Sequence, residues 1–293
     1  MVAPEYYNFT GRAGEVIPRY VTHVLIAKAL KFVCASAFRH HPNIEEVICH
    51  DGVEKIEQEA FQNCPRLLKV IMPGVKKVGS SAFNYCRALN YIECGKLEII
   101  GEEAFSCCHA LRSIDLPSIK IVEKYAFDNC TKLTNAKFGK GLESLGAGAF
   151  FRCPSLERIA LPLKDDMVAF DNTFRMCVKL NNIDLVEGVH ETVAALLLEK
   201  WKNDINGEIA AINRILPNTP AGTSNHLDVG EKAQAIWKWI GSVLGKIVHY
   251  KAKHRRCLNV AAATLQPALP NDILLKSIFP FIELPSHTFQ GED

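Results

Sequence analysis

An Ala-Phe pair with a cysteine three residues after the phenylalanine recurs along the first two thirds of the chain. With two degenerate copies at the ends, the phenylalanines of this pattern are Phe38, Phe61, Phe83, Phe105, Phe127, Phe150 and Phe174. They are separated by 23, 22, 22, 22, 23 and 24 residues. A period of this length is typical of a solenoid, in which each repeat is one coil that buries its apolar face against its neighbours.

Further apolar columns run in step with the phenylalanines. A leucine, or Ile44 in the first unit, stands three residues after each cysteine position, and in most units valine or isoleucine follows three residues later. The apolar spacing then changes from three to two, which indicates a turn followed by a short strand. Pro73, Pro117 and Pro162 end three of these strands. The sequence therefore predicts stacked coils that share a parallel sheet.

These residues resemble a known family, the bacterial surface protein A-like (BspA-like, Treponema-type) leucine-rich repeats. The family pattern Ala-Phe-x-x-Cys-x-x-Leu-x-x-Ile-x-Leu-Pro is matched by Ala104 to Pro117 and within Leu142 to Pro162, and the resemblance covers roughly Val21 to Val189. It implies a right-handed leucine-rich repeat solenoid with a parallel β-sheet on its concave side and short strands or turns elsewhere. The family uses such a solenoid to bind other macromolecules.

The repeats divide the chain into three predicted parts. Residues 1–20 are an N-terminal extension, residues 21–189 are a solenoid of about seven coils, and residues 190–293 are a C-terminal helical region. In the helical region, apolar residues recur every three or four positions from Val193 to Leu216 and again from Ile236 to Tyr250. We therefore expect an α-helical hairpin.

The hairpin has predicted boundaries and a predicted role. Pro217 ends the first helix, a turn-rich loop follows, and Asp228 can cap the second helix. The hairpin could cover the open end of the solenoid, where the last coil would otherwise expose its core. The segment from Asn271 to Leu284 is apolar enough to dock on the rest of the protein.

Six cysteines occupy one column of the repeat: Cys64, Cys86, Cys108, Cys130, Cys153 and Cys177. We interpret them as small buried hydrophobic residues. Coils stack about 4.8 Å apart, so the thiols would lie in a file that cannot surround one metal ion tetrahedrally. Disulfides between adjacent coils fit the distance but not a reducing compartment. Cys107 and Cys257 lie outside the column, and either could be a reactive or a packed thiol.

The residues between the buried columns should project from the concave sheet, because alternate strand residues face opposite sides. We predict that a macromolecular partner binds there, and an ordinary solvated surface is the alternative. Tyr91 and Arg158 are residue types that often dominate binding energy, and Ile48 with Ile71 would form an apolar spot. The candidate residues are Glu46, Ile48, Lys69, Ile71, Tyr91, Glu93, Asp115, Lys137, Arg158 and Asp184.

The second predicted helix carries the strongest charge asymmetry in the chain, since no acidic residue lies between Lys232 and Asn271. A basic amphipathic helix can lie on an anionic membrane, bind the phosphates of nucleic acid, or enter a calmodulin-like groove. An adaptor of this kind is the alternative function, and a solvated helix face is the simpler interpretation. The candidate residues are Lys246, Lys251, Lys253, Arg255 and Arg256.

Composition and absent motifs narrow the functional classes. With 34 basic and 32 acidic side chains, a net charge of +2 provides no global field for nucleic acid or membranes. The start does not have the pattern of a secretory signal, and no stretch approaches the ~20 apolar residues of a membrane span. We therefore expect an intracellular, cytoplasmic protein. Lacking a Walker loop, dinucleotide fingerprint, nucleophile elbow or HExxH pair, it should be a noncatalytic scaffold for a protein partner, with no cofactor or metal site.

Overall fold

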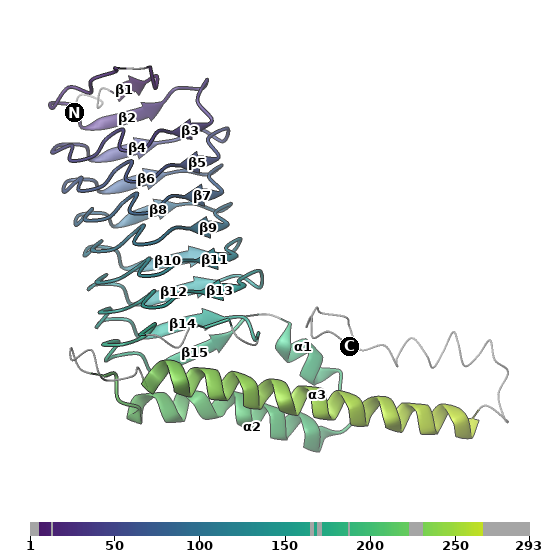
Figure 1. Ribbon diagram of the computed structural model, residues 1–293. Helices are drawn as coiled ribbons and strands as arrows, with labels where there is room; N and C mark the ends of the chain where they lie inside the picture. Colours follow the sequence, from purple (N-terminus) through teal and green to yellow (C-terminus); the bar gives the residue numbers. More distant parts are fainter. Residues whose placement is uncertain are drawn as a thin grey trace, which may run out of the picture.

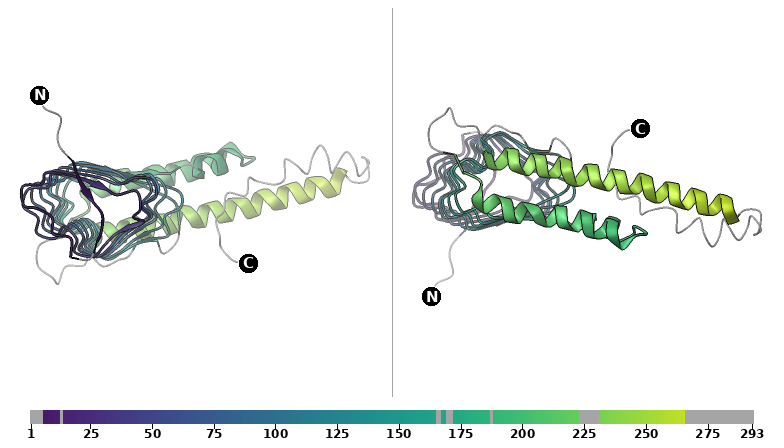
Figure 2. Two further views of the ribbon diagram at one scale, coloured as in Figure 1. Left: turned by 90° about the horizontal axis from the view of Figure 1, so that it is seen from above. Right: turned by 90° about the horizontal axis from the view of Figure 1, so that it is seen from below.

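The computed structural model describes residues 6–12, 14–164, 167–168, 172–186, 188–222 and 231–265. In these residues, short parallel strands stack into a solenoid, and helices lie across its C-terminal end (Figure 1). Seen along its axis, the coils superimpose as a flattened ring, and two long helices cross one end and extend beyond it (Figure 2). The predicted solenoid with a helical C-terminal region is confirmed.

Nine strands form one wall of the solenoid, which we call the nine-strand wall. They pair in parallel as two sheets, in the orders β1-β2-β4-β6-β8 and β10-β12-β14-β15. The strands are β1 (Tyr6–Phe9), β2 (His23–Ile26), β4 (Glu46–Ile48), β6 (Lys69–Ile71), β8 (Tyr91–Glu93), β10 (Ser113–Leu116), β12 (Asn135–Phe138), β14 (Arg158–Leu161) and β15 (Asn182–Leu185). Residues from the predicted N-terminal extension thus contribute β1, which pairs in register with β2.

Six two-residue strands form a third parallel sheet, which we call the six-strand wall. They are β3 (Phe32–Val33), β5 (Lys55–Ile56), β7 (Lys77–Val78), β9 (Ile99–Ile100), β11 (Ile121–Val122) and β13 (Ser144–Leu145). A single bridge from Leu145 to Val168 continues this sheet into the next coil. The second residue of every strand is buried and apolar, and it lies five residues before the phenylalanine of the same coil.

The repeated phenylalanines form a continuous file through the core. Neighbouring ring centroids from Phe38 to Phe174 lie 4.8 to 5.9 Å apart, and neighbouring ring planes are within 8° of parallel. Phe9 adds a tilted ring 4.7 Å above Phe38. Each aromatic pair contributes about 0.5–1.5 kcal/mol beyond the burial of its apolar area. The file therefore accounts for the strict repetition of phenylalanine.

The cysteine column is buried, as predicted, and it also forms hydrogen bonds. Each of the six thiols donates to the carbonyl oxygen of the phenylalanine in the preceding coil, at 3.0 to 3.3 Å. Burial raises the pKa of the Cys64 thiol to about 12 and the pKa of Cys86 well above its ordinary value. These thiols therefore stay protonated and can donate. All eleven cysteines of the chain are free.

The turn around each phenylalanine needs two residues with positive φ. The first lies two positions before the phenylalanine and the second lies two positions after it. Around Phe61 these are Glu59 and Asn63, both at φ 55°. Glycine takes such a position in only one described turn, at Gly148 (φ 63°). The unfavourable conformation is held by backbone hydrogen bonds to the next coil, such as Asn63 N–H to the Asn84 carbonyl at 2.7 Å.

The C-terminal region contains α1 (Val189–Ala194), α2 (Glu199–Ile215), the short 3₁₀ helix η1 (Leu216–Asn218) and α3 (Glu231–Leu265). The first predicted helix is therefore two helices, because the chain leaves helical geometry between Ala194 and Glu199. Pro217 lies in η1 rather than ending α2. Asp228 and the segment from Asn271 to Leu284 lie outside the described residues.

The helices α2 and α3 close the C-terminal end of the solenoid. The Asn213 side chain accepts a hydrogen bond from Ile183 N–H at 2.8 Å and donates to the Ile183 carbonyl at 3.3 Å. Lys232 donates from its ammonium to the Leu180 carbonyl. These bonds satisfy backbone groups in and beside the last strand, β15, which an uncovered edge would leave unpaired. In the structure the helices therefore lie against the last coil, at the end of the solenoid that the hairpin could cover.

Candidate partner-binding face

All ten residues predicted to bind a partner lie on the nine-strand wall, where none of them is buried. They alternate with buried residues such as Val47 and Val70, as the strand geometry requires. The register places the ten in two outward columns along the solenoid. In the N-terminal half of the wall, one column contains Glu46, Lys69 and Tyr91, and the other contains Ile48, Ile71 and Glu93.

At the N-terminal end of the wall, charged side chains are paired with one another. Glu46 pairs with Lys69 at 2.8 Å and accepts a hydrogen bond from the Tyr6 hydroxyl at 2.6 Å. The Lys69 and Tyr6 hydrogen bonds lower the pKa of Glu46. The Lys69 ammonium also lies 5.7 Å from the centroid of the Tyr91 ring. Tyr6 was not predicted as a site residue because it precedes the repeat, although the aromatic residues of Tyr6–Phe9 favour a strand.

The wall is interrupted at its middle, because β8 and β10 do not pair. A small pocket lies in the gap, and Ile92, Cys94 and Ser113 are among the residues that line it. The coils on either side of the gap remain connected, because the Ser118 hydroxyl donates a hydrogen bond to the Gly95 carbonyl at 2.8 Å.

Two acidic residues flank this gap and suggest its cause. Glu93 in β8 and Asp115 in β10 occupy equivalent positions of successive coils, and the charges of both raise the pKa of buried Cys94 after the larger effect of burial. Like charges at neighbouring positions of adjacent strands destabilise their pairing. The two acids were both predicted as site residues, but their proximity to a break in the sheet was not foreseen.

Charges around the gap lack ionic partners inside the described protein. Within the described ranges, Glu93, Asp115 and Lys137 form no ion pair within 4.0 Å, and Arg158 contacts Asp184 at 3.4 Å. The Tyr91 hydroxyl donates to Glu93 at 3.3 Å, and 47% of the Tyr91 surface is exposed. The central part of the wall therefore presents the Tyr91 ring beside Glu93, Asp115 and Lys137, three charged side chains that form no ion pair in the described residues.

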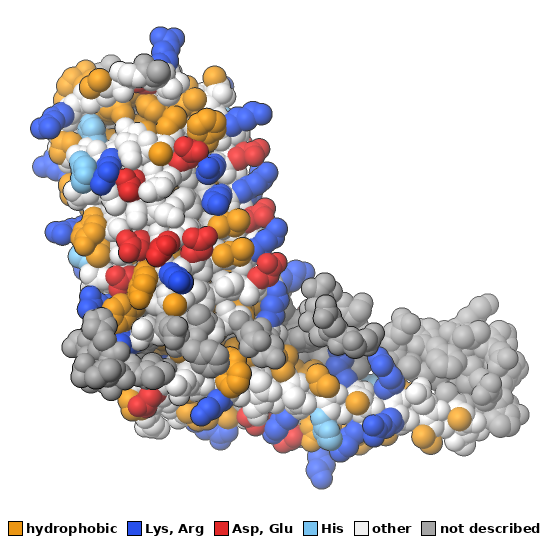
Figure 3. All heavy atoms as spheres, viewed as in Figure 1, with side chains coloured by type: hydrophobic (Ala, Val, Ile, Leu, Met, Phe, Trp, Pro, Cys, Tyr) orange, Lys and Arg blue, Asp and Glu red, His pale blue; other side chains and the backbone are white. Residues whose placement is uncertain are grey.

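The six-strand wall is different, because its charges pair with one another from coil to coil. Lys76 pairs with Glu54 at 3.8 Å, and Lys120 pairs with Glu98 at 2.7 Å. The alternating basic and acidic side chains are visible along the right-hand edge of the solenoid (Figure 3). Such exposed pairs contribute little stability. They leave less unbalanced charge for a partner than the middle of the nine-strand wall does.

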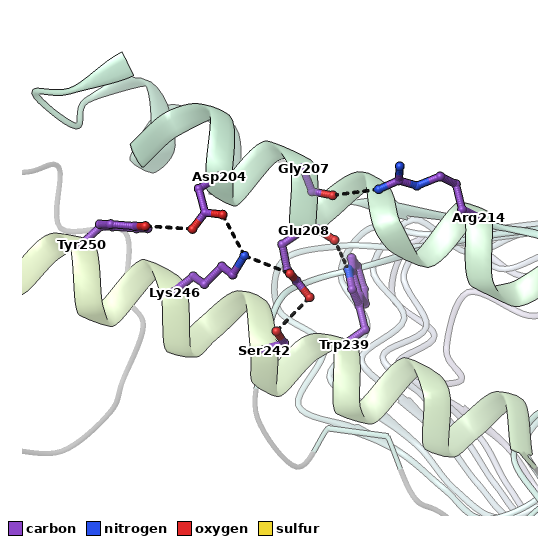
Figure 4. Close-up of polar contacts among 8 residues, drawn as sticks. All are labelled: Asp204, Gly207, Glu208, Arg214, Trp239, Ser242, Lys246 and Tyr250. Atoms are coloured by element: carbon purple, nitrogen blue, oxygen red, sulfur yellow. Dashed lines mark hydrogen bonds and ion pairs between the residues drawn. The ribbon is translucent and has the colours of Figure 1, made fainter. Parts of the chain in front are cut away.

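The structure divides the predicted basic residues of the second helix into two groups. Lys246 lies between α2 and α3, where its ammonium contacts Asp204 and Glu208 at 3.0 Å each (Figure 4). It therefore stabilises the hairpin instead of forming part of an open basic surface. Lys253, Arg255 and Arg256 are exposed, while Lys251 is half-buried and burial lowers its pKa.

Asp204 and Glu208 hold several groups of α3 besides Lys246. The Tyr250 hydroxyl donates to Asp204 at 2.8 Å, the Ser242 hydroxyl donates to Glu208 at 2.8 Å, and the Trp239 indole N–H donates to the Glu208 carbonyl at 2.9 Å (Figure 4). Sequence reasoning missed these acids, although their spacing of four residues on α2 places them on one helix face. The contacts fix the register between the two helices.

The described residues lack the side-chain clusters of a metal site and the long apolar helix of a membrane span. In this part of the chain, no group of three or more histidine, cysteine, aspartate or glutamate side chains is placed to hold a metal ion. No helix within the same ranges combines the length and apolar character that a bilayer span requires.

The stacked coils, the file of buried phenylalanines and the outward columns define a leucine-rich repeat solenoid. The family model for the BspA-type leucine-rich repeat region matches this chain in six copies, over residues 20–119 and 98–196. Because the matches cover more than half of the chain, the protein belongs to the BspA-type leucine-rich repeat family.

Solved structures of bacterial repeat proteins resemble parts of the chain. A leucine-rich repeat protein from Bacteroides ovatus is 31% identical over 48% of this chain and 37% of its own length, with a TM-score of 0.46. The T. pallidum leucine-rich repeat protein is 26% identical over 47% of this chain and 68% of its own length, with a TM-score of 0.45. This chain thus spans well under two thirds of the B. ovatus protein. No curated protein matches it.

Proposed function

We propose that this protein is a noncatalytic scaffold that binds a protein partner through the nine-strand wall. The observation that carries the proposal is that Glu93, Asp115 and Lys137, which form no ion pair among the described residues, lie beside exposed Tyr91 and along the break between β8 and β10. Solenoids of this kind present extended surfaces that bind macromolecules. The helices cover the C-terminal end of the coils and leave the nine-strand wall open (Figure 1).

The size of the wall is compatible with a specific interface. Eight steps of about 4.8 Å between nine strands give a length of about 38 Å, and a standard interface takes about 800 Å² from each partner. Tyrosine and arginine are enriched among residues that dominate binding energy, and Tyr91 and Arg158 are both exposed. A complementary partner would place a basic group near Glu93 and Asp115 and an acidic group near Lys137.

Affinity capture from native lysate with quantitative mass spectrometry tests this proposal. The wall variant is the full chain with Tyr91→Ala and Lys137→Glu. The matched control is Tyr85→Ala with Lys77→Glu, which makes the same changes away from the nine-strand wall; Tyr85 is 43% exposed and Tyr91 47%. The wall variant should lose at least about 90% of the bound partner, because a tenfold loss corresponds to only 1.4 kcal/mol.

The control variant should retain the partner, and thermal melting should show that both variants remain folded. Equal recovery of every captured protein by the wall variant and the control variant would refute the assignment of the binding face.

A further inference from the structure

The gap between β8 and β10 is confined to one side of the solenoid. Most Cα–Cα distances between these two strands exceed 8 Å, whereas paired strands lie about 4.8 Å apart. The same two coils stay joined on the six-strand wall, where β9 pairs with β11 in register. The nine-strand wall is therefore open between two strands while the coils remain stacked behind it (Figure 1).

Both strands present unpaired backbone groups to the gap. Between β6 and β8, Met72 N–H donates to the Glu93 carbonyl at 2.8 Å. The equivalent bond across the gap would join Cys94 N–H to the Asp115 carbonyl, and no such bond forms among the described residues. The N–H and carbonyl of Ile92 face β10 as well, and within the described residues they have no backbone partner. Unpaired edges of this kind can each pair with another strand.

Apolar side chains form the floor of the gap. Ile92 is half-buried, although the equivalent residues Val47 and Val70 are at most 1% exposed. Ile114 occupies the same position in β10 and is also in contact with the pocket. The other apolar residues that line the pocket are Leu97, Phe105, Leu116 and Phe127. A segment that lies in the gap therefore needs an apolar side chain directed inward.

Acidic side chains flank the gap on its outer face. Glu93 and Asp115 are both exposed, and they occupy equivalent positions of β8 and β10. A strand added between β8 and β10 would place one outward residue between the two carboxylates. A lysine or arginine there would face an opposite charge on both neighbouring strands, which stabilises strand pairing.

We infer that the gap binds an extended segment of a partner protein as an additional strand, with alternating apolar and basic side chains. The inference rests on the proposed function and names the kind of segment that the nine-strand wall takes from its partner. An added strand needs about 9.6 Å between its neighbours, twice the usual spacing, and most distances between β8 and β10 already exceed 8 Å. The added backbone completes the ladder on both sides, and its apolar side chains cover the exposed part of Ile92.

Fluorescence anisotropy with labelled synthetic peptides tests this inference on the full chain. The probe is a peptide of alternating valine and lysine, about eight residues long, which is within the usual length of a strand. It should bind at least tenfold more tightly than a matched peptide of alternating valine and glutamate. Hydrogen exchange at the amides of Ile92, Cys94 and Asp115 should slow when the probe binds, because these N–H groups gain acceptors.

Methylation of the peptide nitrogens separates strand pairing from charge attraction. In a strand with neighbours on both sides, successive N–H groups point alternately to one neighbour and the other. Methylating the valine nitrogens alone, or the lysine nitrogens alone, should therefore weaken binding at least tenfold in each case. A strand that pairs with a single edge would be weakened by only one of the two sets.

Charge-reversal variants locate the basic side chains of the probe. Glu93→Lys with Asp115→Lys should reverse the preference, so that the valine–glutamate peptide binds at least tenfold more tightly than the valine–lysine peptide. The matched control is Glu102→Lys with Glu143→Lys, which changes two exposed acids outside the nine-strand wall and should keep the wild-type preference. Circular dichroism melting should show that both variants remain folded.

Several results would overturn the inference. One is the absence of saturable binding of the valine–lysine peptide below about 1 mM. Another is binding that either set of methylated nitrogens leaves unchanged. A third is protection of the gap amides without peptide that increases with protein concentration, which would identify a second copy as the occupant.

The lysate capture distinguishes failure of this inference from failure of the proposed function. A captured partner that is lost in the Tyr91→Ala, Lys137→Glu variant, but leaves the gap amides unprotected when bound, would refute the added strand and leave the scaffold proposal standing. Equal capture by the wall variant and its control would instead refute the binding face itself.

Discussion

Replacing Asn213 with leucine should weaken the closure of the C-terminal end of the solenoid. The Asn213 side chain satisfies both the N–H and the carbonyl of Ile183, a residue only 3% exposed. Leucine has a similar volume but makes neither hydrogen bond. A buried polar group left unsatisfied costs about 1–3 kcal/mol. Asn213 is half-buried, so water can reach part of the site, and we expect about 2–3 kcal/mol for the two groups together.

Tryptophan fluorescence during urea unfolding measures this effect at the right place. All three tryptophans, Trp201, Trp237 and Trp239, lie in α2 and α3, so their emission follows the closing helices. A solenoid is stabilised mainly by contacts between neighbouring units, so loss of its end should unfold the helices before the distant coils. Hydrogen exchange at Phe61 should therefore change less than exchange at β15.

The matched control is Asn203→Leu, an exposed position on the same helix. It makes the same change in helix propensity without touching β15, and such surface substitutions stay within about 0.5 kcal/mol of wild type. The difference between the two variants therefore isolates the contribution of the Asn213 hydrogen bonds. If the two variants unfold at the same urea concentration, the proposed role of Asn213 in closing the sheet is wrong.

Two further substitutions test the core and the hairpin. Cys108→Ala removes the thiol that donates to the Phe83 carbonyl and leaves a small cavity, so urea unfolding should show a loss of about 1–3 kcal/mol; an unchanged midpoint would argue against the thiol hydrogen bond. Hydrogen bonds from Tyr250 to Asp204 and from Ser242 to Glu208 have the largest lowering effect on the pKa values of these acids, and the hydrogen bonds from Lys246 come second. Lys246→Met removes the second contribution at both acids. Carboxyl groups with lowered pKa values stabilise the fold above their ordinary pKa values, and this stability is lost as the pH falls through the lowered values. The wild-type melting temperature should therefore fall more steeply than that of Lys246→Met below about pH 5, and parallel curves would contradict this role.

The repeat determined most of the fold at the level of sequence. Once Phe61 and its equivalents recur at a nearly constant interval, burial of one column in one coil implies burial of the same column in the next. The buried file, the outward position of Tyr91 and the parallel sheet all follow from that regularity. The apolar spacing of three and four after Val189 likewise predicted helices, because helix periodicity is a local property of the chain.

The tertiary structure alone decided the features that depend on contacts between different columns or between helices. The break between β8 and β10 depends on how two successive coils separate around Glu93 and Asp115. In the sequence, Lys246 belongs to a run of basic residues with no acid among them. In the structure, α2 places Asp204 and Glu208 beside its ammonium. The periodic pattern specifies which side of a strand or helix a residue occupies, but the distance to a residue on another element is set only when the elements pack.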